Sequence, residues 1–230
     1  MNLKNLNVCG LHFHCNPEAK CGLKRGKMVI VFDLDGTVID STQALLTAQE
    51  AAWASVGLPC PPPEAILDLI GLPLRHTMKT LAPDQDPDAL AEAYSIAYVK
   101  AATKHEKLFD GMTELLARPF RAAVATGKSQ KGAERALKQC GLFDRFEIIL
   151  GGNSVPNPKP HPDMLYAIME ATGTKDLVMV GDTTYDLEMA HAAGVKGIGV
   201  SWGHHSTERL REWAPVVHSV EELRQALGVN

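Results

Sequence analysis

The sequence predicts an α/β protein in which a parallel sheet is packed between helices, with a small α-helical domain inserted after the first strand. Two observations support this. Short apolar runs alternate with longer helical patterns from Met28 to the C-terminus, which is typical of parallel strands joined by crossover helices. One connection, from Ser41 to Lys107, is rich in Ala and Leu and shows no clear strand. It is too long for a single crossover and is therefore interpreted as a separate helical unit.

Six apolar runs are the candidate strands of the sheet. They are Val29–Phe32, Arg121–Ala125, Glu147–Leu150, Leu177–Val180, Gly197–Val200 and the weaker Val216–Val217. The segment "SQKGAERALKQCG" lies between the second and third of them, has apolar residues at helical spacing and ends at Gly141, so it predicts a crossover helix.

The inserted segment predicts several short helices. It is broken by "GLPCPPPE", "GLPLRH" and "APDQDPD", and such Gly- and Pro-rich stretches end helices. We expect Ser41 to cap the first helix, in which Leu45, Ala48, Ala52 and Val56 recur on one face.

The first 27 residues differ from the rest because they lack a sustained helical or strand period. They contain Cys9, His12, His14, Cys15 and Cys21, but five residues separate successive cysteines, against two to four in paired zinc ligands. We therefore expect a loosely ordered extension, with Met28 a candidate natural start, and no zinc module. The predicted organisation is an extension over 1–27, a catalytic core over 28–40 and 108–230, and a helical insert over 41–107.

The composition narrows the classes of partner. With 23 basic and 27 acidic side chains among 230 residues, the chain has no positive excess for a nucleic acid or an anionic membrane. No run of about 18 apolar residues predicts a membrane span. The five cysteines form no paired framework, which favours a reducing compartment. We expect a cytoplasmic monomer or homodimer that acts on a small molecule.

The residues that follow four of the predicted strands include carboxylates, a hydroxyl and lysines. In open parallel sheets, ligands bind beyond the carboxyl ends of the strands, so these side chains are the candidate site. They are Asp33 and Asp35 after the first strand, Thr126, Gly127 and Lys128 after the second, Lys159 in the loop after the third, and Asp182 and Asp186 after the fourth.

The charge of such a pocket predicts a metal ion. Each pair of like charges at about 4 Å costs on the order of 4 kcal/mol at an effective dielectric constant of 20, and the pocket holds four carboxylates against one ammonium. A divalent cation, together with protonation of one aspartate, brings the charge near zero. Only oxygen ligands are present, which favours Mg²⁺ over zinc or copper.

The segments "DLDGT", "TGK", "PKPHP" and "GDTTYD", in this order, resemble the four motifs of the haloacid dehalogenase (HAD) superfamily. The resemblance covers the chain from Met28 onward, and the position of the insert is similar to the helical cap of the phosphoglycolate phosphatase-like subgroup. It implies a Rossmann-like core, a cap and a Mg²⁺-dependent phosphatase of a small phosphate ester. Gly127 departs from the family, where Asn is frequent, so a backbone contact would replace a side-chain contact.

The resemblance also implies a role for each motif residue. Asp33 would be the nucleophile that attacks phosphorus, and Asp35 the general acid and base. The Asp33 side chain, the Asp35 backbone carbonyl and Asp182 would bind Mg²⁺, with Asp186 orienting a metal-bound water or Lys159. Thr126 and the Gly127 amide would hold phosphoryl oxygens, and Lys159 would neutralise their charge. Lys128 is either a further phosphate contact or an ordinary residue of a first helical turn. Arg75 in the insert is a candidate for binding an anionic substrate tail.

Two alternatives to a phosphatase remain. One is a phosphomutase of the β-phosphoglucomutase type, which returns the phosphoryl group to a sugar, and the other is a non-catalytic binding protein. Asp35 favours a phosphatase over the dehalogenases of the superfamily, which typically lack it, and Thr37 in "DLDGT" favours the phosphatases over the mutases. We expect no catalytic role for the remaining polar residues near the motifs: Asp40 as a solvated or capping residue, Trp202 as a packing residue, and His161, His191, His204 and His205 at the surface.

Overall fold

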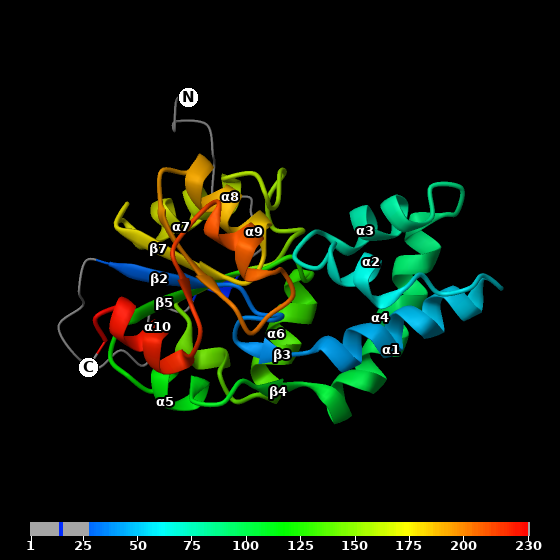
Figure 1. Cartoon of the computed structure of the whole chain (residues 1–230), viewed down its shortest axis with the longest axis horizontal. Coiled ribbons are helices and arrows are strands. Elements are labelled where there is room, and N and C mark those ends of the chain that lie inside the picture. Colours follow the sequence, from blue (N-terminus) through cyan, green and yellow to red (C-terminus); the bar gives the residue numbers. More distant parts are fainter. Residues whose placement is uncertain (1–13, 16–27, 230) are drawn as a thin grey trace.

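The structure, a computed structural model, describes residues 14–15 and 28–229. The chain forms a sheet with helices on both faces, and a helical arm lies to one side of it (Figure 1). The arm is the insert expected from the sequence.

The main sheet has the strand order β1-β6-β5-β2-β7-β8-β9. Six of these strands run parallel, from β6 to β9, and β1 is antiparallel to β6. Their bounds are β1 His14–Cys15, β2 Val29–Phe32, β5 Arg121–Ala125, β6 Ile148–Leu150, β7 Leu177–Gly181, β8 Lys196–Val200 and β9 Val216–Val217. The predicted α/β fold with a parallel sheet is confirmed, and all six predicted runs agree with the structure to within one residue at each end.

Strand β2 lies at the centre of the sheet, and its register fixes the site. Phe32 is level with Val124 of β5 and with Val180 of β7. The residues that follow these three strands therefore meet at one edge of the sheet.

The two faces of β2 support separate hydrophobic cores. Ile30 and Phe32 are buried with residues of α5 (Met112–Leu116), α6 (Gln130–Gln139) and α10 (Val220–Ala226). Val29 and Val31 are buried with residues of α7 (Asp163–Thr172) and α8 (Thr184–Ala192). The near-continuous apolar runs of the sequence follow from this burial on both faces. The short helices η3 (Phe143–Arg145) and α9 (Thr207–Arg211) are the remaining helices of the described chain outside the arm.

The helical arm consists of α1 (Thr42–Ser55), α2 (Pro63–Leu67), α3 (Leu74–Leu81) and α4 (Pro87–His105), and it has its own hydrophobic core. Two short strands, β3 (Ile39–Asp40) and β4 (Lys107–Leu108), pair antiparallel where the chain enters and leaves the arm. This two-stranded stem lies at the two ends of the insert predicted over 41–107. The exact division stays a prediction. We refer to the arm as the cap.

Two details of helix α1 differ from the sequence prediction. Ser41 occupies the N-cap position, but its side chain makes no capping hydrogen bond and its hydroxyl donates to Asp35. Val56 lies beyond the helix and is 37% exposed. The helix ends at Ser55 because Gly57 adopts a left-handed conformation (φ 70°), which is typical of helix C-termini.

The N-terminal segment is described only at His14–Cys15, which pair with Ile148 and Ile149 at the edge of the sheet. The sequence had predicted no strand there. The other possible zinc ligands of this segment lie outside the described residues: Cys9, His12 and Cys21. The expected loose order of residues 1–27 therefore stays a prediction. Within the described part of the chain, no helix is both long enough and apolar enough to span a membrane.

Candidate active site

The site lies beyond the carboxyl ends of the central strands, where the register of the sheet brings the motif residues together. Asp33 follows β2, Thr126 follows β5 and Asp182 follows β7. Lys159 reaches the same place from the loop between β6 and α7, and Asp186 comes from the first turn of α8. All five residues are buried.

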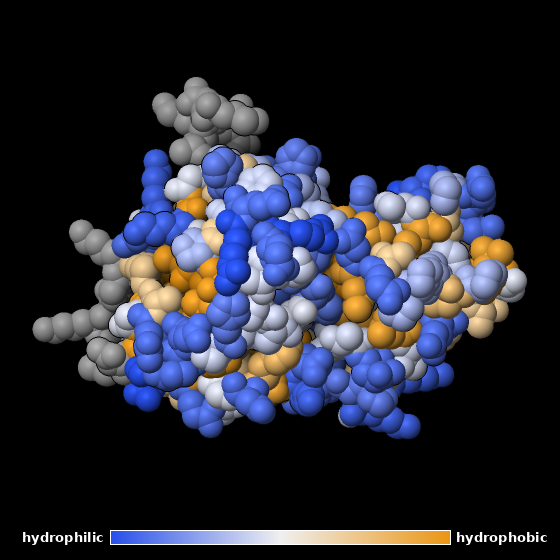
Figure 2. Space-filling model, viewed as in Figure 1, coloured by the Kyte–Doolittle hydropathy of each residue, from blue (hydrophilic) through white to orange (hydrophobic). Residues whose placement is uncertain are grey.

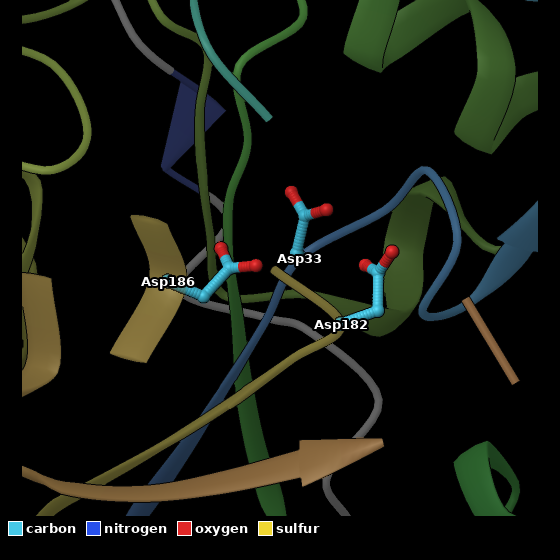
Figure 3. Close-up of side chains that lie close together, drawn as sticks. All are labelled: Asp33, Asp182 and Asp186. Atoms are coloured by element: carbon cyan, nitrogen blue, oxygen red, sulfur yellow. The ribbon is translucent and has the colours of Figure 1, made fainter. Parts of the chain in front are cut away.

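Three carboxylates form the centre of the site. Asp33, Asp182 and Asp186 each offer an oxygen, and these oxygens all lie within 4.8 Å of one another. Figure 3 shows the three side chains close together, with their carboxylates on the same side of the strand ends. Three buried carboxylates at this distance repel one another strongly unless a positive charge lies between or beside them.

Lys159 supplies one such charge. Its ammonium donates to Asp33 Oδ1 at 2.8 Å and also to Asp186 Oδ1. Burial by itself would lower the pKa of Lys159, but the charges of Asp186 and Asp33 outweigh it and hold the pKa above its usual value. Lys159 is therefore a fixed cation beside the proposed nucleophile, and not a surface lysine.

The ion pair with Lys159 neutralises the Asp33 carboxylate only in part. Burial raises the pKa of Asp33 to about 7, and Lys159 offsets only part of the effect, because Asp186 and Asp182 raise the pKa further. Its second oxygen, Oδ2, is buried and has no hydrogen-bond partner within the described structure. A buried carboxylate oxygen without a donor is costly, so this atom indicates a missing ligand.

Asp182 is held by donors on both of its oxygens. Thr37 Oγ1 donates to Oδ1 at 2.7 Å, and the backbone N–H of His204 donates to Oδ2 at 2.9 Å. The His204 ring Nδ1 also lies 2.8 Å from Oδ2. Burial alone would raise the pKa of Asp182, but the bonds to His204 and Thr37 lower it, so Asp182 stays ionised.

Asp35 is not part of the three-carboxylate cluster. Its Oδ1 accepts a hydrogen bond from Lys128 Nζ at 2.8 Å and one from Ser41. Lys128 Nζ also donates to the hydroxyl of Tyr98 on cap helix α4, at 2.7 Å, and that hydroxyl donates to Glu106 at 2.6 Å. Lys128 therefore joins Asp35 to the cap. The expected metal contact of Asp35 through its backbone carbonyl stays a prediction.

A cavity of about 430 Å³ lies between the cap and the core, and Asp33, Asp35, Thr126, Gly127 and Lys128 line its core side. A Cβ atom on Gly127 would lie 2.3 Å from the backbone oxygen of Gly71, in the loop between α2 and α3. Glycine at 127 therefore allows the cap loop to approach the core closely.

The structure does not bring every predicted site residue to the cavity. Arg75 is exposed on α3, where its Nε donates to Asp88 at 2.7 Å, and it does not line the cavity. Its guanidinium is satisfied by a carboxylate of the cap itself, so the geometry gives no support to the predicted contact with a substrate tail. Asp40, which the sequence predicts to be a solvated or capping residue, contacts Lys107 in the stem at 3.5 Å and accepts from the backbone N–H of Thr42 at 3.4 Å.

Two of the four histidines expected at the surface are instead buried, and this corrects the prediction. His161 and His191 are exposed. The His204 side chain is 2% exposed and contacts Asp182, and His205 accepts from the backbone N–H of Thr184 at 3.0 Å. Burial alone would lower the pKa of His204, but its bond to Asp182 and the charge of Asp182 raise it. The sequence did not indicate these two histidines because they follow β8, where no carboxylate marks the site. Their position just beyond the end of a strand was the one signal that could have identified them.

The donor set fits a Mg²⁺ ion. Asp33, Asp182 and Asp186 offer only oxygen, which is the ligand type that Mg²⁺ prefers, and the unpartnered Asp33 Oδ2 lies among them. No nitrogen or sulfur ligand belongs to this cluster in the described chain, which disfavours a zinc site.

The fold and the site together define an α/β enzyme with an active site of buried carboxylates and a lysine, covered by a helical insert. The model of the family described as haloacid dehalogenase-like hydrolase matches residues 30–200. The chain belongs to this family, and the resemblance seen in the motifs is confirmed.

Three similar proteins extend the comparison. The chain is 34% identical to a probable phosphatase, IndB, of Dickeya dadantii, over 88% of this chain and 93% of that protein. It is 33% identical to a phosphoglycolate phosphatase of Thiobacillus denitrificans, over 80% of this chain and 87% of the relative. The solved structure of protein tyrosine kinase A (PtkA) of Mycobacterium tuberculosis matches with a TM-score of 0.71 and 26% identity, over 87% of this chain and 98% of that one.

Proposed function

We propose that this protein is a Mg²⁺-dependent phosphatase that hydrolyses a small phosphomonoester through an aspartyl-phosphate on Asp33. The observation that carries the proposal is the geometry of Asp33: it lines the cavity, its Oδ1 is held by Lys159, and its buried Oδ2 has no partner. Relatives named as phosphatases support the same reaction class.

Two carboxylates divide the chemistry. Asp33 attacks phosphorus, the bond between phosphorus and the ester oxygen breaks, and Asp35 gives its proton to the leaving alkoxide. Asp35 then takes a proton from the water that attacks the aspartyl-phosphate. Phosphate is released, and the Asp33 carboxylate is restored. A nucleophile must be ionised while a proton donor must hold a proton, so the two steps require two separate carboxylates.

The other residues hold charge and position. Thr126 and the amide of Gly127 lie at the cavity wall, where they would bind phosphoryl oxygens. Lys159 would neutralise charge that spreads over those oxygens in the transition state. Asp33, Asp182, Asp186 and the backbone carbonyl of Asp35 would hold Mg²⁺, which supplies electrostatic stabilisation of the same charge.

The proposal also includes the cellular location of the protein. Cys60 and Cys140 are both free thiols, which supports a reducing, cytoplasmic environment. A small phosphate ester is the proposed partner, with phosphoglycolate as the first ester to be assayed, and the oligomeric state is to be measured as monomer or homodimer.

Two variants of the opening motif test the mechanism, with p-nitrophenyl phosphate as substrate. Asp33→Asn removes the nucleophile, so turnover should fall to background. Asp35→Asn keeps the nucleophile, and nitrophenolate leaves without a proton, so this variant should release about one equivalent of nitrophenol in a burst and then turn over slowly. Acid-quenched mass spectra should show an added mass of about 80 Da, that of one HPO₃ unit on Asp33.

Asp40→Asn is the matched control, because Asp40 belongs to the stem and lies outside the three-carboxylate cluster. It should keep the wild-type rate. A mass adduct on the Asp33→Asn protein, or wild-type steady-state turnover in Asp35→Asn, would show that the assigned roles are wrong. Transfer of the phosphoryl group to a sugar phosphate, with no free phosphate, would instead identify a mutase.

A further inference from the structure

The cap side of the cavity is mainly apolar. Leu45 of α1, Leu69 and Leu72 of the loop between α2 and α3, and Tyr94 and Val99 of α4 all face it. Val99 is 52% exposed, so about half of this apolar side chain is left open at the cavity. Figure 2 shows apolar side chains gathered where the cap meets the core.

The polar side chains on the cap wall are largely engaged within the cap. Thr77 Oγ1 donates to the Leu69 carbonyl at 3.4 Å, and Ser95 Oγ donates to the Ala91 carbonyl at 2.6 Å. Gln49 Oε1 accepts from Trp53 Nε1 at 3.1 Å, while the Gln49 amide nitrogen makes no hydrogen bond within the described chain. Few groups on this wall are therefore available to bind the hydroxyls of a sugar.

The cations that line the cavity are also engaged, with one exception. Lys128 lies 2.8 Å from Asp35, and Arg135 lies 3.0 Å from Glu106. In the described chain, Lys131 has no ion-pair partner, but it is exposed, so its charge is solvated and weak at a distance. A carboxylate on the substrate would meet apolar side chains and the negative Asp33 and Asp35 instead of a buried cation, which is costly.

The size of the cavity disfavours a very small alcohol. Its volume is about 430 Å³, and a water molecule takes about 30 Å³ in the liquid, so a two-carbon tail would leave most of it to be filled by water against apolar walls. A ring-sized apolar group would displace that water and bury apolar surface.

We infer that the preferred substrate, given the phosphatase activity proposed above, is the phosphate ester of a neutral, apolar alcohol about the size of a benzyl group, and not a short carboxylated ester such as phosphoglycolate. The phosphoryl group binds at Asp33, Thr126 and Lys159, and the alcohol lies between Leu72, Tyr94 and Val99. The cap wall therefore determines specificity through burial of apolar surface.

Four esters that differ one property at a time test this inference in the presence of Mg²⁺: benzyl phosphate, 4-carboxybenzyl phosphate, ethyl phosphate and phosphoglycolate. We expect kcat/KM for benzyl phosphate to exceed each of the others at least tenfold, because a whole ring contributes more than the single methylene that is worth about 10-fold or more in an apolar pocket. A preference for either carboxylated ester would overturn the inference and indicate that Lys131 binds an anionic tail. Equal rates for benzyl and ethyl phosphate would overturn it too. Inactivity toward all four and toward p-nitrophenyl phosphate would overturn the phosphatase proposal itself.

A pair of cap variants locates the effect. Val99→Asp places a charge on the apolar wall and should lower the ratio of kcat/KM for benzyl over ethyl phosphate at least fivefold, mainly through KM. Ile96→Asp is the matched control, since Ile96 is also on α4 and is 58% exposed but does not line the cavity, and it should keep the wild-type ratio. Because both side chains are exposed, both variants should fold. Equal ratios in the two variants would show that the cap wall does not select the alcohol.

Discussion

Asp33 is subject to two opposing demands. As a nucleophile it must be ionised, yet its burial raises its pKa to about 7 in the described chain, with Lys159 compensating only partly. A cation beside Oδ2 would lower that pKa, because an opposite charge stabilises the carboxylate. Binding of the metal and ionisation of the nucleophile should therefore be linked.

This linkage predicts that Mg²⁺ binding depends on pH. Below pH 7, Asp33 is protonated in the free protein and must lose its proton when Mg²⁺ binds, so the apparent affinity should rise about tenfold per pH unit and level off above pH 7. Titration calorimetry at pH 6 in two buffers of different ionisation enthalpy should detect close to one released proton. In Asp33→Asn the proton release should disappear. An affinity that is the same at pH 5.5 and pH 7 would contradict the linkage.

At the same scale, the sequence predicted the acidic and basic residues of the site better than their partners. Asp33, Asp182 and Lys159 could be predicted because each follows a recognisable apolar run or lies in a motif. The contact of His204 with Asp182 could not, because it depends on how the loop after β8 folds back over β7. The pairing of Arg75 could not be predicted for a related reason: its partner, Asp88, is thirteen positions away in another cap helix, and no local pattern reveals that pairing.

At the scale of elements, the parallel strands were predictable because burial on both faces makes them continuous apolar runs. Strand β1 was not, since two residues carry no period. His14–Cys15 pair with β6 at one edge of the main sheet, and the site lies beyond the carboxyl ends of the strands. An edge pairing this short adds only a few backbone hydrogen bonds to the sheet.

Deletion of residues 1–27 should therefore leave kcat/KM within about twofold of wild type and lower the melting temperature slightly. Each lost hydrogen bond is worth about 0.5–1.5 kcal/mol net, and each kcal/mol shifts the melting temperature by about 2–4 °C in a chain of this size. Calorimetry and steady-state kinetics check this. Deletion of residues 1–13 alone keeps His14–Cys15 and is the control, so any difference between the two truncations belongs to residues 14–27. Loss of folding or activity, or a stoichiometric zinc ion in the full-length protein, would show that the extension has a function.

At the scale of the whole molecule, the loop that follows α2 adds a few contacts between cap and core to the one that Lys128 makes with Tyr98. The backbone carbonyl of Asp68 accepts from Tyr185 at 3.0 Å and lies 3.1 Å from His205 Nε2, and the Asp68 carboxylate pairs with Arg209. The carboxylate pair is exposed and contributes little. The close approach of Gly71 to Gly127 adds a steric requirement, so the closed arrangement depends on the absence of a side chain at 127.

Gly127→Ala should therefore separate the cap from the core. A Cβ atom at 127 would lie 2.3 Å from the oxygen of Gly71, and a backbone atom gives way only if the whole loop moves. Gly127 has no positive φ and alanine keeps the N–H, so neither backbone strain nor loss of the amide donor accounts for the effect. We expect kcat/KM to fall at least tenfold, and amide exchange over residues 68–72 to become faster.

Gly132→Ala is the control for this prediction. Its Cβ would lie 3.2 Å from the end of the Ser129 side chain, within helix α6, where alanine is favoured over glycine by about 1 kcal/mol. Amide exchange over 68–72 should then stay at the wild-type rate, and the melting temperature should stay equal or rise. If Gly127→Ala kept both wild-type turnover and wild-type exchange, the approach of Gly71 to Gly127 would not determine whether the cap closes over Asp33.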